Sequence, residues 1–511
     1  RLSLNSAGKG YDAVFSGGIR DFGNYKNGDG LEIPTSFESY DYSAKIGISS
    51  FKNQRLQIGW RQSFGRDILH VGLPMDTDED NSSVASIDYA IKNIGDKLYG
   101  ITFKSFLSKV DHIMENSRRP NFMMVDAVST VDALTAGGKL EFSITPNAKN
   151  QLYTGVDFRY LTRDGERARL IKRNMMTGET IDPPAKKIDL IWQDAQQSDI
   201  GIFIENKFFN NDKLTFTAGA RADFIASEIN NPAPDFLALY PGLKKETEIN
   251  ISANISADYR FNKIWNLQFA LGRGTRTANM EERFINHFQL GVDAYEYVGN
   301  PNLKSEANHQ AELSLNKNKG AFQLKTSVFY SYITDYITAV VDETLDRKFL
   351  PMNLPQNARR FQNIDAATQT GFEIQGQYSF AKYLSLKGSA SYTRAQNKDW
   401  HEALPEIPPF TASLGLVFEK DWLTADIRGR YASKQDRISQ SFGKTITPSF
   451  SVFDLRIGTR PVEGLSIGAA MLNIFDANYY EHLNRGYRNN SEQGLIFEPG
   501  RNITAFVKYE F

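Results

Sequence analysis

The sequence has no cysteine among its 511 residues, and it also lacks any long apolar run. Without cysteine, disulfides, zinc-thiolate sites and cysteine catalysis are excluded within this chain. Without an apolar run of about 18 residues, transmembrane helices are excluded as well, and the mean hydropathy is −0.43. A transmembrane β-barrel stays open, because its strands alternate apolar and polar residues and average out as hydrophilic.

An excess of charge of either sign is missing too. Lys and Arg number 59 and Asp and Glu number 60, so the formal net charge is −1. A general nucleic-acid binder needs a basic excess to neutralise phosphates, and we therefore expect no nucleic-acid partner. Aromatic residues, in contrast, make up 12% of the chain, which suits the aromatic girdles of membrane barrels.

Strand periodicity runs through much of the sequence. Residues 322–332, 372–380, 384–392 and 423–431 alternate apolar and polar side chains with a period of two. These stretches are nine residues or longer, whereas strands of soluble sandwiches usually have about 5–6 residues. Strands of this length suit the crossing of a bilayer at a tilt.

The connections alternate between short and long. Short polar turns lie at 146–149, 210–212 and 316–320, and long polar stretches lie at 66–83, 111–137, 162–197, 279–303, 396–409 and 478–500. Outer-membrane barrels have short periplasmic turns and long extracellular loops, so this alternation predicts sidedness. At about 23 residues per strand with its connection, the length predicts an all-β, antiparallel transmembrane β-barrel of about 22 strands. No internal boundary is visible, and we expect residues 1–511 to form a single domain.

Four short motifs and the terminal Phe511 resemble those of TonB-dependent receptor barrels. The motifs are residues 271–282 (LGRGTRTANMEE), 299–306 (GNPNLKSE), 472–480 (LNIFDANYY) and 499–502 (PGRN). The resemblance implies a barrel in the outer membrane of a Gram-negative bacterium, surrounded by lipid, with a transport function and no enzyme activity. It also implies coupling to TonB through an N-terminal plug domain in the lumen. Arg1 lies at the first expected strands, so we expect the plug to be encoded upstream and absent from this chain.

The placement of methionine points to a cargo. Six of the nine methionines fall within about a fifth of the chain, on or next to the expected extracellular loops: Met75, Met114, Met123, Met124, Met175 and Met176. His70 and His112 lie in the same region. A thioether is a soft ligand suited to Cu(I), and imidazole suits copper in either oxidation state. Residues two apart in an extended segment face the same side, so His112 and Met114 could both face the lumen, just above the expected last strand residues Lys109 and Val110.

The sequence around this pair resembles a copper-receptor subgroup of the family, at residues 110–116 (VDHIMEN) and 73–76 (LPMD). In that subgroup a His-x-Met pair at this position binds copper. The resemblance therefore implies that His112 and Met114 are copper ligands, with the remaining ligands on the plug. Copper would be the cargo, and no resident cofactor is expected. The weaker candidates are His70, Met75, Met123, Met124, Met175 and Met176; for the last four, packing between loops is the competing interpretation.

Other cargoes and other classes of protein stay open. Several arginines could attract an anionic chelate, which keeps a ferric siderophore or haem receptor as the alternative: Arg118, Arg119, Arg167, Arg169 and Arg173. A surface adhesion or assembly barrel is a third hypothesis. An outer-membrane hydrolase is disfavoured, because no Ser/His/Asp set has a recognisable motif. A surface lipoprotein is a further possible partner. The other histidines are expected on the surface or in loops: His287, His309, His401 and His482.

Overall fold

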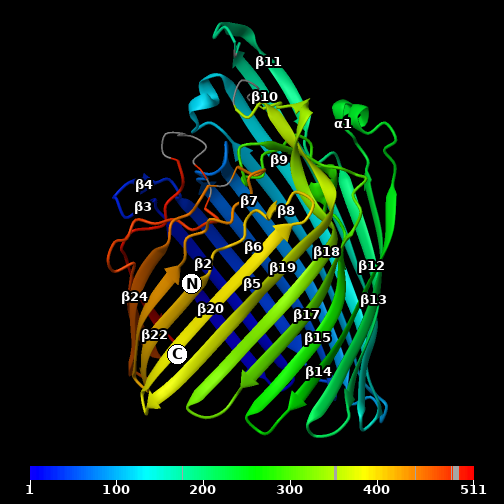
Figure 1. Ribbon diagram of the computed structural model, residues 1–511, viewed down its shortest axis with the longest axis vertical. Helices are drawn as coiled ribbons and strands as arrows, with labels where there is room; N and C mark the ends of the chain where they lie inside the picture. The colour runs from blue at the N-terminus through cyan, green and yellow to red at the C-terminus, as the bar shows by residue number, and fades with distance from the viewer. Residues whose placement is uncertain (175, 350–353, 444, 485, 487–493) are drawn as a thin grey trace.

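The protein is a tall ring of long antiparallel strands whose longer connections gather at one end (Figure 1). The computed structural model describes residues 1–511 except 175, 350–353, 444, 485 and 487–493. The helices of this described part are short: α1 (Pro234–Leu239), α2 (Met280–Phe284) and the 3₁₀ helix η1 (Pro120–Met123). None of the helices found there is long and apolar enough to cross a membrane. The prediction of an all-β protein is confirmed.

The wall is built from strands that pair antiparallel with their neighbours in chain order. In the described part of the chain the large sheet has 24 strands. Three of them are side branches that lie off the ring, which leaves 21: β11 (Thr180–Leu190), β16 (Glu296–Val298) and β21 (Glu402–Ala403). The first ten of these are β1 (Leu2–Gly8), β2 (Tyr11–Phe22), β5 (Phe37–Ile48), β6 (Gln54–Ile68), β7 (Asp76–Lys92), β8 (Leu98–Glu115), β9 (Val125–Asn147), β10 (Asn150–Arg173), β12 (Ala195–Phe209) and β13 (Leu214–Ile229). The others are β14 (Glu246–Arg260), β15 (Trp265–Arg276), β17 (Glu306–Lys317), β18 (Phe322–Asp346), β19 (Asn357–Ala381), β20 (Leu384–Asn397), β22 (Thr411–Lys420), β23 (Leu423–Ala432), β24 (Phe450–Val462), β25 (Leu465–Leu472) and β26 (Asn502–Tyr509). A separate pair, β3 (Tyr25–Lys26) and β4 (Glu32–Ile33), lies between β2 and β5.

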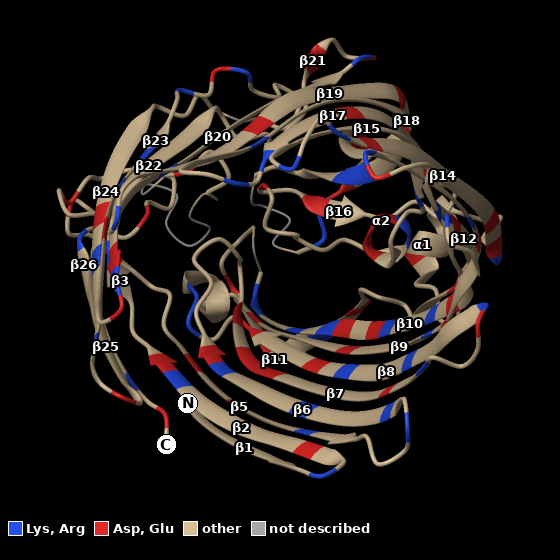
Figure 2. Cartoon of the chain, turned by 90° about the horizontal axis from the view of Figure 1, so that it is seen from below, with Lys and Arg blue, Asp and Glu red and all other residues tan. Residues whose placement is uncertain are grey.

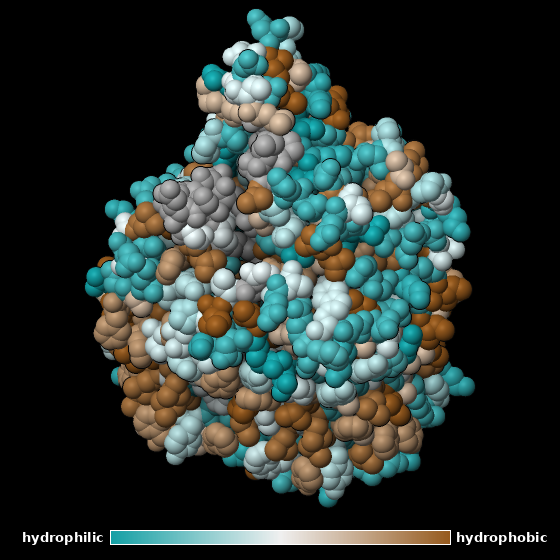
Figure 3. Space-filling model, turned by 45° about the horizontal axis from the view of Figure 1, so that its top comes forward, coloured by the Kyte–Doolittle hydropathy of each residue, from teal (hydrophilic) through white to brown (hydrophobic). Residues whose placement is uncertain are grey.

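Alternate side chains of each strand face the two sides of the wall. Ile200 and Ile202 of β12 are exposed, and they lie opposite Phe158 and Val156 of β10 in the strand register. Such rows join into an outward apolar surface around the lower part of the molecule (Figure 3). Lipid contacts this surface in an outer-membrane barrel, and the intervening polar residues line the lumen.

Several strands continue far above this apolar surface, as β10 and β11 do at the top of Figure 1. β9 has 23 residues and β10 has 24, so much of residues 111–137 and 162–197 is strand, and the prediction of long loops there was wrong. The reason is that a strand above the membrane meets water on its outer face and therefore reads as polar. Lys109 is an example, since its Nζ lies 3.0 Å from Asp111 and 3.1 Å from Asp132 on the outer face.

The ring has two edge strands, β1 and β26, and every residue in both is exposed. β1 leads into the short turn before β2, and β26 follows the long connection from β25, so both run toward the short-turn end. Within the described residues these two strands are not paired with each other. Their chain ends lie near each other in the ring when it is seen from below (Figure 2). The wall therefore holds one strand fewer than the expected number of about 22.

Candidate metal-binding site

A group of His, Met and Thr side chains lies on the lumen side of the wall, at the long-loop ends of β6, β7 and β8. Phe103 and Leu107 of β8 are exposed on the outer face. His112 and Met114 have the opposite parity in the same strand, which extends to Glu115, so both face the lumen. The expectation that they lie above the last strand residues was wrong, but the side they face is the one that the alternation predicts.

A β-bulge in β7 places two polar residues on this same face. Thr77 lies opposite Met114 and Asp80 lies opposite His112, with the register shifted between Thr77 and Glu79. Residues three apart in a regular strand face opposite sides. The extra residue of the bulge compensates for this, so Thr77 and Asp80 both point toward the His112 side of the sheet.

The hydroxyl of Thr77 lies between two imidazoles. Its Oγ1 is 3.0 Å from Nε2 of His70 and 3.5 Å from Nε2 of His112. Nδ1 of His112 lies 3.4 Å from a carboxylate oxygen of Asp80. Thr77 is fully buried, so the two imidazole nitrogens are held near one point that is shielded from solvent.

Two methionines lie close to Thr77: Met114 is opposite it in the strand register, and Met75 precedes it by two residues in the chain. Met75 and Met114, which are 3% and 7% exposed, form a buried cluster with Val125, Ala127 and Phe349, and Met124 packs against it. We refer to these five buried residues as the methionine cluster. The view of the methionines as wet loop residues is therefore wrong for Met75 and Met114. Their thioethers and the two imidazoles give a set of soft and borderline donors.

A buried ion pair fixes the turn that carries His70 and Met75. Arg119, in the β8–β9 connection, contacts the carboxylate of Asp76, and its Nη2 also donates to the carbonyls of His70 (2.6 Å) and Met75 (3.2 Å). The carboxylate of Asp76 in turn accepts the backbone N–H of His70 at 2.8 Å. Arg119 and Asp76 are both buried, so this contact sets where the turn lies relative to β8.

Burial lowers the pKa of His70, and the neighbouring charge of Arg119 acts in the same direction, although Asp76 opposes both. A depressed pKa keeps the imidazole neutral at pH 7. Only the neutral ring has a lone pair for a metal. His70 is thus in the protonation state that metal binding needs.

The structure brings together five of the eight candidate residues: His70, Met75, His112, Met114 and Met124. It does not bring two others to them, since Met123 and Met176 are 65% and 80% exposed. Met175 lies outside the described residues. In the described part of the chain, no group of three or more His, Asp or Glu side chains is arranged to hold a metal ion. The site consequently depends on its sulfur donors.

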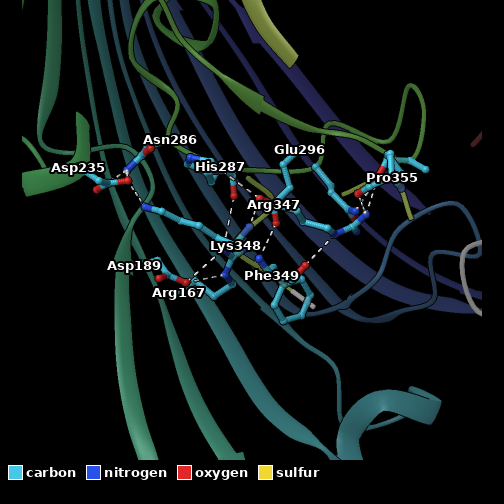
Figure 4. A network of polar contacts seen from close by, with 12 residues as sticks. Arg167, Asp189, Asp235, Asn286, His287, Glu296, Arg347, Lys348, Phe349 and Pro355 are labelled. Carbon is cyan, nitrogen blue, oxygen red and sulfur yellow. Dashed lines mark hydrogen bonds and ion pairs between the residues drawn. The ribbon is translucent and has the colours of Figure 1, made fainter. Parts of the chain in front are cut away.

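A second polar network includes the loop segment that carries Phe349 of the methionine cluster, and no pattern in the sequence indicated it (Figure 4). Glu296 of β16 is fully buried and accepts hydrogen bonds from the backbone N–H groups of Lys348 (2.8 Å) and Phe349 (2.7 Å). Nδ1 of His287 lies 3.2 Å from the same carboxylate. His287 is in a loop as expected, but it is buried and not on the surface.

The arginines considered for an anionic chelate have partners within the chain. Four of them form ion pairs: Arg118 with Asp67, Arg119 with Asp76, and Arg167 and Arg169 with Asp189. Arg167 is buried, and its guanidinium carbon lies 4.6 Å from the centre of the Phe349 ring. Each of these four arginines therefore already contacts a carboxylate of this chain, and Arg167 and Arg169 share one.

Comparison with known proteins identifies the barrel. The family model for "TonB dependent receptor-like, beta-barrel" matches residues 2–474. The structure of a protein titled copper transporter OprC superposes with a TM-score of 0.86 at 20% identity, covering 100% of this chain and 77% of that one. The FrpB iron transporter from Neisseria meningitidis gives a TM-score of 0.71 at 16% identity, covering 100% of this chain and 78% of the other. At these identities the likeness concerns the fold.

Sequence similarity leads to proteins named for haem. Heme/hemopexin utilization protein C of Haemophilus influenzae is 28% identical over 263 residues, which are 46% of this chain and 35% of that protein. The hemin receptor of Yersinia enterocolitica is 28% identical over 229 residues, which are 42% of this chain and 31% of the other. The match thus covers about a third of the length of these relatives. From the family match over nearly its whole length, we conclude that this chain belongs to the TonB-dependent receptor family and is a β-barrel of the Gram-negative outer membrane.

Proposed function

We propose that this chain is the barrel of a TonB-dependent transporter that imports copper, as the ion or as a small complex. The observation that carries the proposal is the position of two imidazole Nε2 atoms, of His70 and His112, at one buried hydroxyl beside the methionine cluster. Those side chains face the lumen near the long-loop end, where a cargo arriving from outside would meet them first.

The donor chemistry favours copper over harder cations. Thioether and imidazole ligands select copper, whereas carboxylate, carbonyl and water ligands suit Mg²⁺, Ca²⁺ and Mn²⁺. Asp80 is the carboxylate beside His112, and its contact is with Nδ1, which leaves Nε2 for a metal. In copper proteins and other metal sites, such a carboxylate orients the histidine ligand and raises its basicity.

The remaining parts of the transporter lie outside this chain. His112 and Met114 are the main ligands in this proposal, His70 and Met75 complete the barrel side, and a plug domain in the lumen supplies further ligands. Release of the cargo toward the periplasm would use energy delivered by TonB through the plug. In this proposal the plug and the barrel therefore meet at the lumen face of β7 and β8.

The copper content of the full-length receptor tests the proposal. After copper loading and desalting, the variants His112→Ala and Met114→Leu should retain roughly tenfold less copper than the parent. Met123→Leu and Met176→Leu are matched controls, because the same substitution is made at exposed methionines outside the cluster, and both should retain copper like the parent. Equal copper retention in the parent, His112→Ala and Met114→Leu would refute the assignment.

Haem is the second candidate cargo, because the names of the two relatives given above contain heme or hemin. Haem carries two propionates. Arg119 is paired with Asp76, and Arg167 and Arg169 share the carboxylate of Asp189. Titration of the full-length receptor with haem, followed by its Soret absorbance, separates the two candidates. A saturable haem spectrum together with no copper retention would move the assignment to haem.

A further inference from the structure

The methionine cluster is closed on one side by a residue that does not belong to the neighbouring wall strands. Met75 and Met114 come from the β6–β7 turn and β8, whereas Phe349 comes from the connection between β18 and β19. Phe349 is 1% exposed. A loop phenylalanine from another part of the ring is therefore buried in the same cluster as the two methionines.

Residues 347–349 are held by hydrogen bonds to groups in other loops and by Arg169 of β10, whose Nη1 donates to the carbonyl of Lys348 at 3.0 Å. Both N–H groups of Lys348 and Phe349 donate to the single carboxylate of Glu296 in the β15–β17 connection. The side chain of Lys348 pairs with Asp235 of α1, in the β13–β14 connection. Arg347 Nη1 donates to the carbonyl of Ala294 at 3.2 Å, again in the β15–β17 connection (Figure 4). This segment can thus leave its place without the loss of any strand pairing in the wall.

Glu296 is the centre of this attachment. Its carboxylate is fully buried and accepts three hydrogen bonds, two of them from consecutive backbone N–H groups. Hydrogen bonds to an ionised acceptor are about twice as strong as neutral ones. An amide of the same shape would turn an NH₂ group toward one of the N–H donors, which leaves a buried donor unsatisfied.

We propose that Phe349 is a removable cover over Met75 and Met114 and that Glu296 is the positioning residue that holds this cover closed. The closed cover keeps water and oxidants from the thioethers, and a cargo reaches Met75 and Met114 when the segment 347–349 moves away. This inference gives the cluster a controlled entrance, and it relies on the proposed function only for what passes through that entrance.

Oxidation of methionine by hydrogen peroxide reports the cover without any metal. In the intact full-length receptor, mass spectrometry of peptides measures the sulfoxide formed at each methionine. Met75 and Met114 should oxidise about tenfold or more slowly than exposed Met123 and Met176. Phe349→Ala and Glu296→Gln should raise the rates at Met75 and Met114 several-fold. Met280, the first residue of α2, is buried in a different cluster from Phe349 and should stay protected.

Phe442→Ala is the matched control. Phe442 is also a buried loop phenylalanine under an arginine, with the guanidinium carbon of Arg359 4.3 Å from its ring centre, yet it is not part of the methionine cluster. This variant should leave Met75 and Met114 as protected as in the parent. Unchanged rates at both residues in Phe349→Ala and Glu296→Gln would overturn the proposal, and so would a rise at Met280 of the same size, which indicates general loosening. If the oxidation rates rise selectively but the full-length receptor retains no copper, the cover is supported and only the copper assignment is refuted.

Discussion

Nδ1 of His112 faces a carboxylate oxygen of Asp80 at 3.4 Å, and this contact determines which ring nitrogen is free. With its proton on Nδ1, the imidazole directs the lone pair of Nε2 toward Thr77 and the neighbouring imidazole of His70. Asp80 can take this place only because the bulge of β7 rotates it to the lumen face.

The first prediction concerns this carboxylate. Asp80→Asn removes the charge that favours the Nδ1–H form, so the copper retention of the full-length receptor should fall roughly 10- to 100-fold. Asp111→Asn is the matched control, because Asp111 pairs with Lys109 on the outer face of the wall and has no contact with the site. If both variants hold copper equally well, Asp80 has no orienting role.

The second prediction compares two adjacent arginines. Arg119→Met leaves the buried carboxylate of Asp76 without its cation, and the free energy of unfolding should fall by about 3–5 kcal/mol. Arg118→Met breaks an exposed pair with Asp67, which should cost less than about 1 kcal/mol. Urea unfolding in detergent micelles measures both. Equal losses in the two variants would show that Arg119 does not hold the turn of His70 and Met75.

The third prediction concerns acidic pH. Burial opposes ionisation of Glu296, but the hydrogen bond of His287 and the charge of Arg167 hold its pKa below the usual 4.5. The pKa of Asp235 is likewise lowered, since its pairing with Lys348 outweighs its burial. A lowered carboxylate pKa stabilises the folded state above the unfolded value, and this contribution is lost as pH falls through the folded value. Arg347 also faces Glu296 and stays charged throughout.

The cover should therefore loosen only below about pH 4.5. Peroxide oxidation of Met75 and Met114 should speed up as the pH falls from about 4.5 to about 3 in the parent. It should change much less in Glu296→Gln, which has no carboxylate to protonate at this position. A parent rate that is flat over this range would contradict the role given to Glu296.

The fourth prediction concerns the glycine of the GNPNLKSE motif. A Cβ at Gly299, in the GNPNLKSE segment, would lie 2.4 Å from the carbonyl carbon of Arg283 and 2.5 Å from the backbone nitrogen of Phe284. Gly299→Ala should displace α2 and cost about 1–3 kcal/mol. Gly274→Ala is the matched control, because a Cβ there meets nothing within 4 Å. Urea midpoints compare the two, and oxidation of Met280 reports whether α2 has moved.

The wall could be predicted from the sequence because successive side chains of a strand face opposite sides and those facing the bilayer must be apolar. The result is an apolar–polar period of two in the membrane-spanning strands. The same alternation gave the side that His112 and Met114 face. What it could not give is the height of the strands, since residues such as Asp111 and Asp132 lie in strands above the membrane but read as loop.

Contacts across the lumen could not be predicted from the sequence. Phe349 meets Met75 and Met114 although it is more than 200 positions away from either, and no local pattern encodes such a pairing. Glu296 read as one acidic residue of a polar loop, yet it is fully buried. The bulge between Thr77 and Glu79 was equally hidden, because the polar residues around it carry no apolar alternation that would reveal a shift in register.

The direction of the two edge strands has a consequence for the parity of the barrel. β1 and β26 run the same way, so a seam sealed by regular antiparallel pairing takes an odd number of additional strands, and a single one makes the total even, as in bacterial outer-membrane barrels. Such a strand must run opposite to both neighbours and form hydrogen bonds with the N–H and C=O groups of both edge strands. Each of these groups costs several kcal/mol if it has no hydrogen-bond partner in hydrocarbon. The lateral integrity of the whole cylinder then depends on this one seam.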